Sequence, residues 1–253
     1  MDLSLFCDTY IIAEYFRLTG ILENMPRYKT GSHNGYPVIR EYSGRGDDKK
    51  TRVAHLNGKI YSEMQKKLEL FNNTTKAKNI YGAEISRRYL IIPKDFKLIR
   101  EPSEFDMNAW DQMEAAANSF EQKPRYFDDF GFNVRSRGEM FVGNVLKELG
   151  LEAKYEPMIL LNSGKKKCPD YSFPVPVIGR CFFAEFFGMS ENDGYINYNY
   201  GKIEEYMRNG ILPNRDLILI CGAEKWMPSH ESIKRMIASF INNAVLRTYN
   251  RKW

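Results

Sequence analysis

The segment RCFFAEFFGM at residues 180–189 limits the folds open to this chain more than any other stretch. Apolar residues fill almost every position, which is typical of a strand at the centre of a sheet. One acidic residue, Glu185, stands within the segment, after Ala184 and before Phe186. A buried carboxylate needs a hydrogen-bond partner, an opposite charge or a metal ion, so we expect Glu185 to have such a partner.

Helical and strand patterns alternate on both sides of this segment. We expect helices over 138–150, 195–210 and about 229–249, and strands over 152–161, 169–173, 180–189 and 216–221. The order helix, three strands, helix, strand, helix predicts an α/β layer fold with a mixed sheet.

The first hundred residues read differently, as a small α+β module. We expect a helix over 4–23, short strands over 36–42 and 51–56, and a helix that has Ser62 as its N-cap and continues through Leu70. A helix over 104–120 and an acidic loop with Asp128 and Asp129 follow. The predicted organisation is therefore a basic helix, hairpin and helix module (1–100), a helical connector with the acidic loop (101–133) and an α/β domain (134–253).

Composition narrows the class of protein. The chain has 253 residues, of which 43% are hydrophobic and 27% charged, and its four cysteines are far apart without a CxxC spacing. We therefore expect reduced thiols rather than a zinc site or a disulfide framework. The apolar stretch near the start carries charged residues, and the acidic beginning lacks the basic region of a signal peptide. A cytoplasmic protein without a membrane segment is expected.

Charge is distributed unevenly along the chain. Residues 25–100 hold 17 Lys and Arg against 7 Asp and Glu, whereas residues 101–130 hold 2 against 8. A basic region of this kind is either a surface that faces phosphate groups or an ordinary solvated face. The first alternative makes the module 1–100 a candidate nucleic-acid-binding element.

Two acids on neighbouring predicted strands suggest chemistry. Asp170 follows Pro169 at the start of one strand, and Glu185 lies in the next. Carboxylates from adjacent strands can hold a hard divalent cation, which lowers the pKa of a water molecule and offsets charge on a phosphate. Glu139 on the preceding helix and Lys202 on the following one can assist. The plain alternatives are a turn aspartate, an acid favoured at a helix N-terminus and a solvated lysine.

Pro169-Asp170, followed after fourteen residues by Glu185, resembles the PD-(D/E)XK nuclease superfamily. The stretches VRSRGE, CPDYSF, AEFFGM and YMRNGILPNRDLILI are also similar to a group of uncharacterised bacterial proteins, over residues 134 to 222. The resemblance implies a restriction-endonuclease-like core and a magnesium- or manganese-dependent endonuclease acting on nucleic acid, DNA rather than RNA. It gives Asp170, Glu185 and Glu139 as metal ligands and all three as catalytic residues.

The chain departs from that pattern at two positions. The lysine expected two residues after Glu185 is Phe187, so Lys202 is the substitute that the resemblance suggests. Position 186 is also Phe, where the bacterial group has His. The competing hypothesis is therefore a nucleic-acid-binding or protein-interaction module that has lost cleavage.

Basic residues near the predicted site suit phosphate binding or plain surface charge, and both readings stay open. They are Arg135, Arg137, Lys165, Lys166 and Lys167. Four tyrosines between 195 and 206 suit either stacking on bases or packing in the core. A homodimer is a further open alternative, and no membrane partner is expected.

Overall fold

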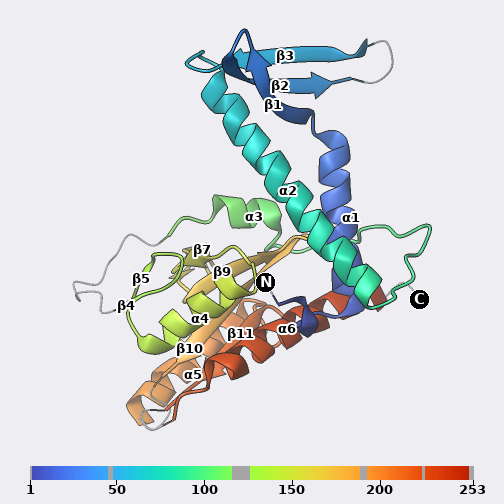
Figure 1. Cartoon of the computed structure of the whole chain (residues 1–253). Coiled ribbons are helices and arrows are strands. Elements are labelled where there is room, and N and C mark those ends of the chain that lie inside the picture. The colour runs from blue at the N-terminus through green and yellow to red at the C-terminus, as the bar shows by residue number, and fades with distance from the viewer. Residues whose placement is uncertain (1, 45–47, 116–125, 189–192, 224–225, 251–253) are drawn as a thin grey trace. The chain divides into compact units, whose positions relative to one another are not determined.

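The computed structural model describes residues 2–44, 48–115, 126–188, 193–223 and 226–250 (Figure 1). The protein is a mixed α/β chain that divides into two compact units. Residues 10–98 form the N-terminal unit, and residues 99–253 together with 1–9 form the C-terminal unit.

The N-terminal unit is an antiparallel sheet packed on a long helix. Its elements are α1 (Asp8–Asn24), β1 (Arg27–His33), β2 (Tyr36–Ser43), β3 (Lys50–His55) and α2 (Tyr61–Arg87), with strand order β1-β2-β3. Tyr28, Ile39 and Ala54, one from each strand, are buried around Met64 of α2. The rings of Tyr10 in α1 and Tyr81 in α2 lie 6.5 Å apart between their centroids.

Three expectations for this region were wrong in detail. The helix expected over 4–23 is a 3-10 turn, η1 (Leu3–Leu5), followed by α1 from Asp8. The second helix has Ile60 rather than Ser62 as its N-cap, and it runs to Arg87 because Thr74, Tyr81 and Ile85 continue its buried side. Strand β1 was not expected, since only Tyr28 of its seven residues is buried.

The C-terminal unit is built around the expected mixed sheet, with strand order β11-β10-β9-β6. Its strands are β6 (Lys154–Tyr155), β9 (Tyr171–Val175), β10 (Arg180–Phe187) and β11 (Leu217–Cys221). Strands β6, β9 and β10 pair antiparallel, and β10 pairs parallel with β11. Every residue of β10 is buried, as expected for a central strand.

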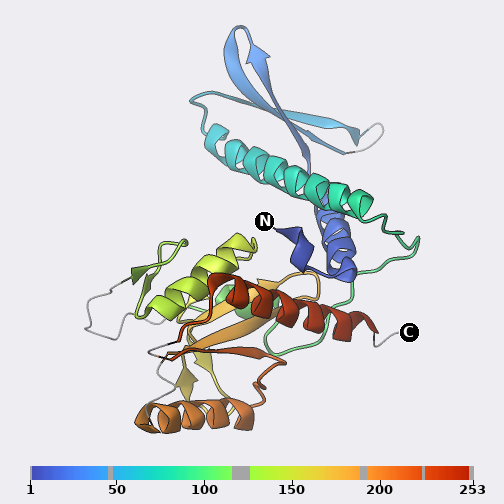
Figure 2. The ribbon, with the colours of Figure 1, turned by 60° about the horizontal axis from the view of Figure 1, so that its bottom comes forward.

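Helices cover both faces of this sheet (Figure 2). They are α4 (Arg137–Glu148), α5 (Asp193–Arg208) and α6 (His230–Asn250), and the chain order α4-β6-β9-β10-α5-β11-α6 agrees with the predicted order. Phe182 packs edge-on against Phe240 of α6 on one face. Its neighbour Phe183 clusters with Tyr206 of α5 on the other face. Because side chains alternate along a strand, Glu185 and Phe187 lie on the α5 face together with Phe183.

Two elements of the C-terminal unit differ from expectation. The strand expected over 152–161 is broken at Glu156, whose φ of 43° is incompatible with a continuous strand. Its second half is β7 (Ile159–Leu160), which pairs with β8 (Lys166–Lys167). The helix expected over 104–120 is the short α3 (Met107–Gln112), and residues 116–120 lie outside the described part of the chain. The acidic loop contains a small hairpin of β4 (Tyr126–Phe127) and β5 (Asn133–Val134).

Two findings bear on the class of protein. Among the described residues, no helix has both the length and the apolar character needed to cross a membrane. The four cysteines, all within the described ranges, carry free thiols.

Candidate active site on the central sheet

Three acids lie at consecutive positions in a row across the sheet. Tyr171 of β9 pairs with Tyr155 of β6 on one side and with Ala184 of β10 on the other. Asp170, one residue before β9, lies between Glu156 and Glu185: the Glu156 N–H donates to the Asp170 carbonyl at 2.9 Å, and the N–H of Phe186, next to Glu185, donates to Asp170 Oδ2. The row is buried: Glu156 is 7% exposed, Asp170 4% and Glu185 1%.

Asp170 sits at the start of β9, where its carboxylate accepts two hydrogen bonds. The backbone N–H of Phe186 donates to Oδ2 at 2.7 Å, and Nη2 of Arg135 lies 3.3 Å from Oδ1. Burial, followed by the nearby Glu185 and Glu139 carboxylates, raises the pKa of Asp170 well above its usual 3.8. A positive charge beside this carboxylate is therefore favourable.

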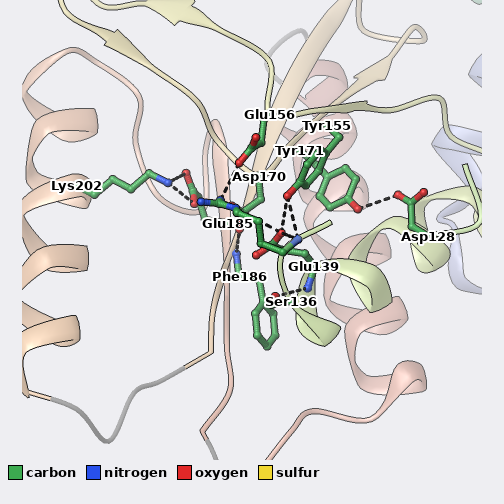
Figure 3. A network of polar contacts seen from close by, with 11 residues as sticks. Asp128, Ser136, Glu139, Tyr155, Glu156, Asp170, Tyr171, Glu185, Phe186 and Lys202 are labelled. Carbon is green, nitrogen blue, oxygen red and sulfur yellow. Dashed lines mark hydrogen bonds and ion pairs between the residues drawn. The ribbon is translucent and has the colours of Figure 1, made fainter. Parts of the chain in front are cut away.

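Glu185 is held from the α5 side (Figure 3). Nζ of Lys202 lies 2.7 Å from each of its carboxylate oxygens, and the Tyr206 hydroxyl donates to Oε1 at 2.8 Å. Burial raises the pKa of Glu185, and the Lys202 ammonium opposes that rise. Burial also lowers the pKa of Lys202, but the Glu185 and Asp170 carboxylates outweigh it, so the net pKa is raised and Lys202 stays protonated.

Arg135, between β5 and α4, connects the acids of the row. Its Nη2 lies 2.9 Å from Oε1 of Glu156 and 3.3 Å from Oδ1 of Asp170, and its Nε lies 3.9 Å from Oε2 of Glu139. Its side chain is 41% exposed. The predicted phosphate-binding arginine therefore sits among the acids of the candidate site and reaches the surface beside them.

Glu139 belongs to the first turn of α4. Arg135, which contacts both Glu139 and Asp170, connects the two acids. Ser136 caps the helix by accepting from the Glu139 N–H, and Glu139 Oε2 accepts from the Arg135 N–H at 3.0 Å and from the Tyr155 hydroxyl at 2.7 Å. This local sequence favours the arrangement because Ser, two residues and Glu form a capping pattern. Glu139 is thus part of the same network but makes no direct bond to Asp170 or Glu185.

Two glycines let α4 approach the sheet closely. A Cβ at Gly138 would lie 1.9 Å from the ring of Phe186, and one at Gly143 would lie 2.3 Å from Oδ2 of Asp128. Asp128 in turn accepts a buried hydrogen bond of 2.8 Å from the Tyr171 hydroxyl. The expected acidic loop therefore supplies a buried anchor for β9 next to the row of acids.

The other basic residues that the sequence suggested lie apart from the row. Arg137 rests over the ring of Phe141 at 5.2 Å. On the β7–β8 hairpin, Lys165 and Lys167 form ion pairs with Glu205 of α5 at 3.0 and 2.5 Å, and Lys166 is exposed. Within the described residues only Arg135 of these five contacts the acids.

Sequence reasoning missed Glu156 and Tyr155, and it considered Tyr206 for base stacking or core packing but not as a partner of Glu185. Glu156 lies within the strand expected over 152–161, which is the strand before the one that starts at Asp170. Because that strand was expected to be continuous, nothing singled out Glu156 as a residue beside Asp170. Tyr206, one of four tyrosines near α5, is 1% exposed, whereas Tyr198 and Tyr200 are 71% and 73% exposed. The side chain of the fourth, Tyr195, lies outside the described part of the chain.

The donor set suits a magnesium ion held in part by solvent and substrate. Within the described ranges, no three or more His, Cys, Asp or Glu side chains are grouped so as to hold a metal ion. Magnesium is commonly bound by one or two carboxylates together with waters and substrate phosphates. Asp170 and Glu185 are two buried carboxylates that could supply such ligands; in the structure their oxygens are bonded to Arg135, the Phe186 N–H, Lys202 and Tyr206.

The chain was compared with protein-family models, curated proteins and solved structures. No family model, curated protein or solved structure matches it.

Proposed function

We propose that the protein is a metal-dependent nuclease that hydrolyses phosphodiester bonds of nucleic acid, DNA rather than RNA, on a restriction-endonuclease-like core. The observation that carries this proposal is that Asp170 lies beside Glu185, with its carboxylate bonded to the N–H of the next residue, Phe186, and that Lys202 contacts Glu185. The mixed sheet between α5 on one face and α4 and α6 on the other supports the finer fold.

Asp170 and Glu185 would hold a magnesium or manganese ion. When bound, such an ion lowers the pKa of a water molecule and stabilises charge on a phosphate oxygen. Two buried carboxylates side by side repel each other, and this repulsion is relieved when a cation lies between them. That relief gives a physical reason for placing acids in an otherwise apolar strand pair.

Lys202 acts as a fixed positive charge in this proposal. Because its pKa is raised, it is not a proton acceptor at neutral pH. Its ammonium can instead orient the attacking water and offset the charge that develops on the phosphate. Phe187 occupies the position where the superfamily pattern has a lysine, and it projects from the same face of β10 as Glu185. Lys202 of α5 approaches that same face.

Arg135 and Glu139 would position the metal-binding acids. Arg135 bonds to both Asp170 and Glu156, and its exposed part can contact a phosphate beside the acids. Glu139, held by Ser136 and Tyr155, fixes the backbone N–H of Arg135. Glu139 therefore acts on Asp170 through Arg135 rather than directly on the reacting atoms.

One observation favours a second candidate, a nucleic-acid-binding module without cleavage. Asp170 and Glu185 already have cationic partners in Arg135 and Lys202, and two aromatic residues follow Glu185. In that case the acids serve only the stability of the sheet.

Cleavage assays separate the two candidates. Wild type and Glu185→Ala are incubated with labelled linear, branched and single-stranded DNA and RNA, in magnesium, manganese or EDTA. We expect metal-dependent cutting by the wild type and none by the variant. Salt-sensitive binding by both proteins without cutting would instead support the binding module.

A further inference from the structure

The N-terminal unit contains a large open groove that the proposed catalytic site does not use. Its walls are the last turns of α1, the segment leading into β1, the end of β2, the start of β3 and the middle of α2. Its volume is about 1190 Å³. Small-molecule pockets are commonly about 300–1,000 Å³ and more enclosed, so the groove suits an extended ligand.

Positive charge converges on the groove from three elements that are far apart in the sequence. Arg27 and Lys29 come from β1, Lys49 and Lys50 from the start of β3, and Lys78 from α2. A single acid, Glu23, is the only negatively charged residue lining the described groove. The arrangement therefore favours a polyanion.

The strand cations are available to a ligand. Arg27 and Lys29 are both exposed, and both line the groove. Neither of their side chains, nor that of Lys49 or Lys50, forms a hydrogen bond or ion pair with another residue in the described ranges. Within the described part of the protein, these positive charges are therefore not neutralised by an ion pair.

Aromatic rings accompany the charges. Tyr42, which is 38% exposed, and the half-buried Phe71 also line the groove. Single-stranded nucleic acids are bound by basic grooves that follow the backbone and by aromatic rings on which bases stack. The unit as a whole has 17 Lys and Arg against 9 Asp and Glu, a net charge of +8. A nucleic-acid strand matches both features, whereas an acidic protein or a lipid surface matches the charge alone.

We infer that this groove of the N-terminal unit binds the sugar–phosphate backbone of a nucleic-acid strand. Arg27, Lys29 and Lys50 contact phosphates, and Tyr42 offers its ring to a base. The inference gives the proposed nuclease a substrate-binding surface but depends on none of its catalytic residues.

Binding is tested with the full chain in EDTA, where metal-dependent cutting is prevented. The groove variant is Arg27→Gln/Lys29→Gln/Lys50→Gln. The control, Lys59→Gln/Lys66→Gln/Lys76→Gln, removes the same charge from exposed lysines of the same unit that do not line the groove. Fluorescence anisotropy measures binding of labelled single-stranded DNA over a range of salt concentrations, and circular dichroism verifies that both variants are folded.

We expect the groove variant to bind about tenfold or more weakly at moderate salt. The slope of the logarithm of affinity against the logarithm of salt concentration should fall by about 2, because each lost phosphate contact to a single strand contributes about 0.7. The control should keep the wild-type slope.

Three outcomes would overturn the inference. They are equal losses in both variants, no DNA binding by the wild type, and tighter binding of the wild type to polyglutamate or to anionic phospholipid vesicles than to DNA. The nuclease proposal fails separately: a wild type that binds DNA through the groove but never cuts it leaves this inference standing.

Discussion

Lys202 and Glu185 meet across a separation of 17 residues, with Nζ of Lys202 2.7 Å from the carboxylate. The lysine comes from α5 and the glutamate from β10, so the contact depends on how that helix packs on the sheet. Glu185 is 1% exposed, and its side-chain hydrogen-bond partners among the described residues are the Lys202 ammonium and the Tyr206 hydroxyl. In the proposed nuclease, Lys202 is the positive charge that orients the attacking water and offsets charge on the phosphate, and this contact holds it beside Glu185.

Replacement of Lys202 by methionine tests the role of its charge. We expect Lys202→Met to reduce metal-dependent cleavage by about 100-fold or more, within the range typical of a residue that assists proton transfer or charge stabilisation. Lys202→Arg should retain part of the activity because it keeps the charge. Arg208→Gln, on the exposed side of the same helix, is the control. Single-turnover cleavage rates are the measurement, and equal rates for Lys202→Met and wild type would contradict the assignment.

The pH dependence of stability reports on Asp170. Its pKa is raised by burial, so the folded chain retains a proton that the unfolded chain releases near 3.8. Where the native state binds more protons than the unfolded state, the free energy of unfolding falls as pH rises. From pH 3.8 upward through the folded pKa, wild type should therefore lose stability relative to Asp170→Asn. Urea denaturation in EDTA at several pH values measures this difference, and a difference that is constant with pH would refute the prediction.

Gly138 tests the close packing of α4 on β10. We expect Gly138→Ala to destabilise the protein by about 1–2 kcal/mol, because overpacking at the buried Phe186 ring outweighs the gain in helix propensity. Gly201→Ala in α5 is the matched control, since no described atom outside its own helix backbone and chain neighbours lies within 4 Å of its new Cβ. It should stabilise by about 0.5–1 kcal/mol. Denaturant titrations decide, and equal gains in both variants would show that α4 is not tightly packed.

Arg135 and a bound metal ion are both expected to offset the negative charge of Asp170. Arg135→Met should lower the free energy of unfolding by about 1–2 kcal/mol in metal-free buffer, a value moderated by the partial exposure of the guanidinium. Added magnesium should then stabilise the variant more than the wild type, because a bound cation replaces the lost charge. Arg137→Met, which removes a cation that rests on Phe141, is the control. An identical response of Arg135→Met and wild type to magnesium would argue against a shared role.

The regular parts of the C-terminal unit could be predicted from the sequence. The run around Glu185 predicted the buried central strand, and the amphipathic segments predicted α4, α5 and α6. Their patterns are strong because each element buries a continuous face against the same sheet. The partner of Glu185 was expected, and the structure supplies Lys202 in that place.

Other features depend on contacts that no local pattern contains. The break at Glu156 arises from a single backbone angle, and β1 shows no alternation of apolar residues. The sequence left Arg135 open between phosphate binding and plain surface charge, because two of the three acids that it contacts lie 21 and 35 positions further along the chain. The role of Tyr206 depends on its depth in the fold rather than on its neighbours in the sequence.

Binding of manganese tests the central claim, that Asp170 and Glu185 together hold a divalent cation. Metal-free protein is titrated with Mn²⁺, and the free ion is followed by its electron paramagnetic resonance signal. We expect saturable binding by wild type and by the surface control Glu204→Gln, and binding about tenfold or more weaker in Asp170→Asn and Glu185→Gln. Equal binding in all four proteins, or no saturable binding by the wild type, would mean that the acids serve only as partners of Arg135 and Lys202.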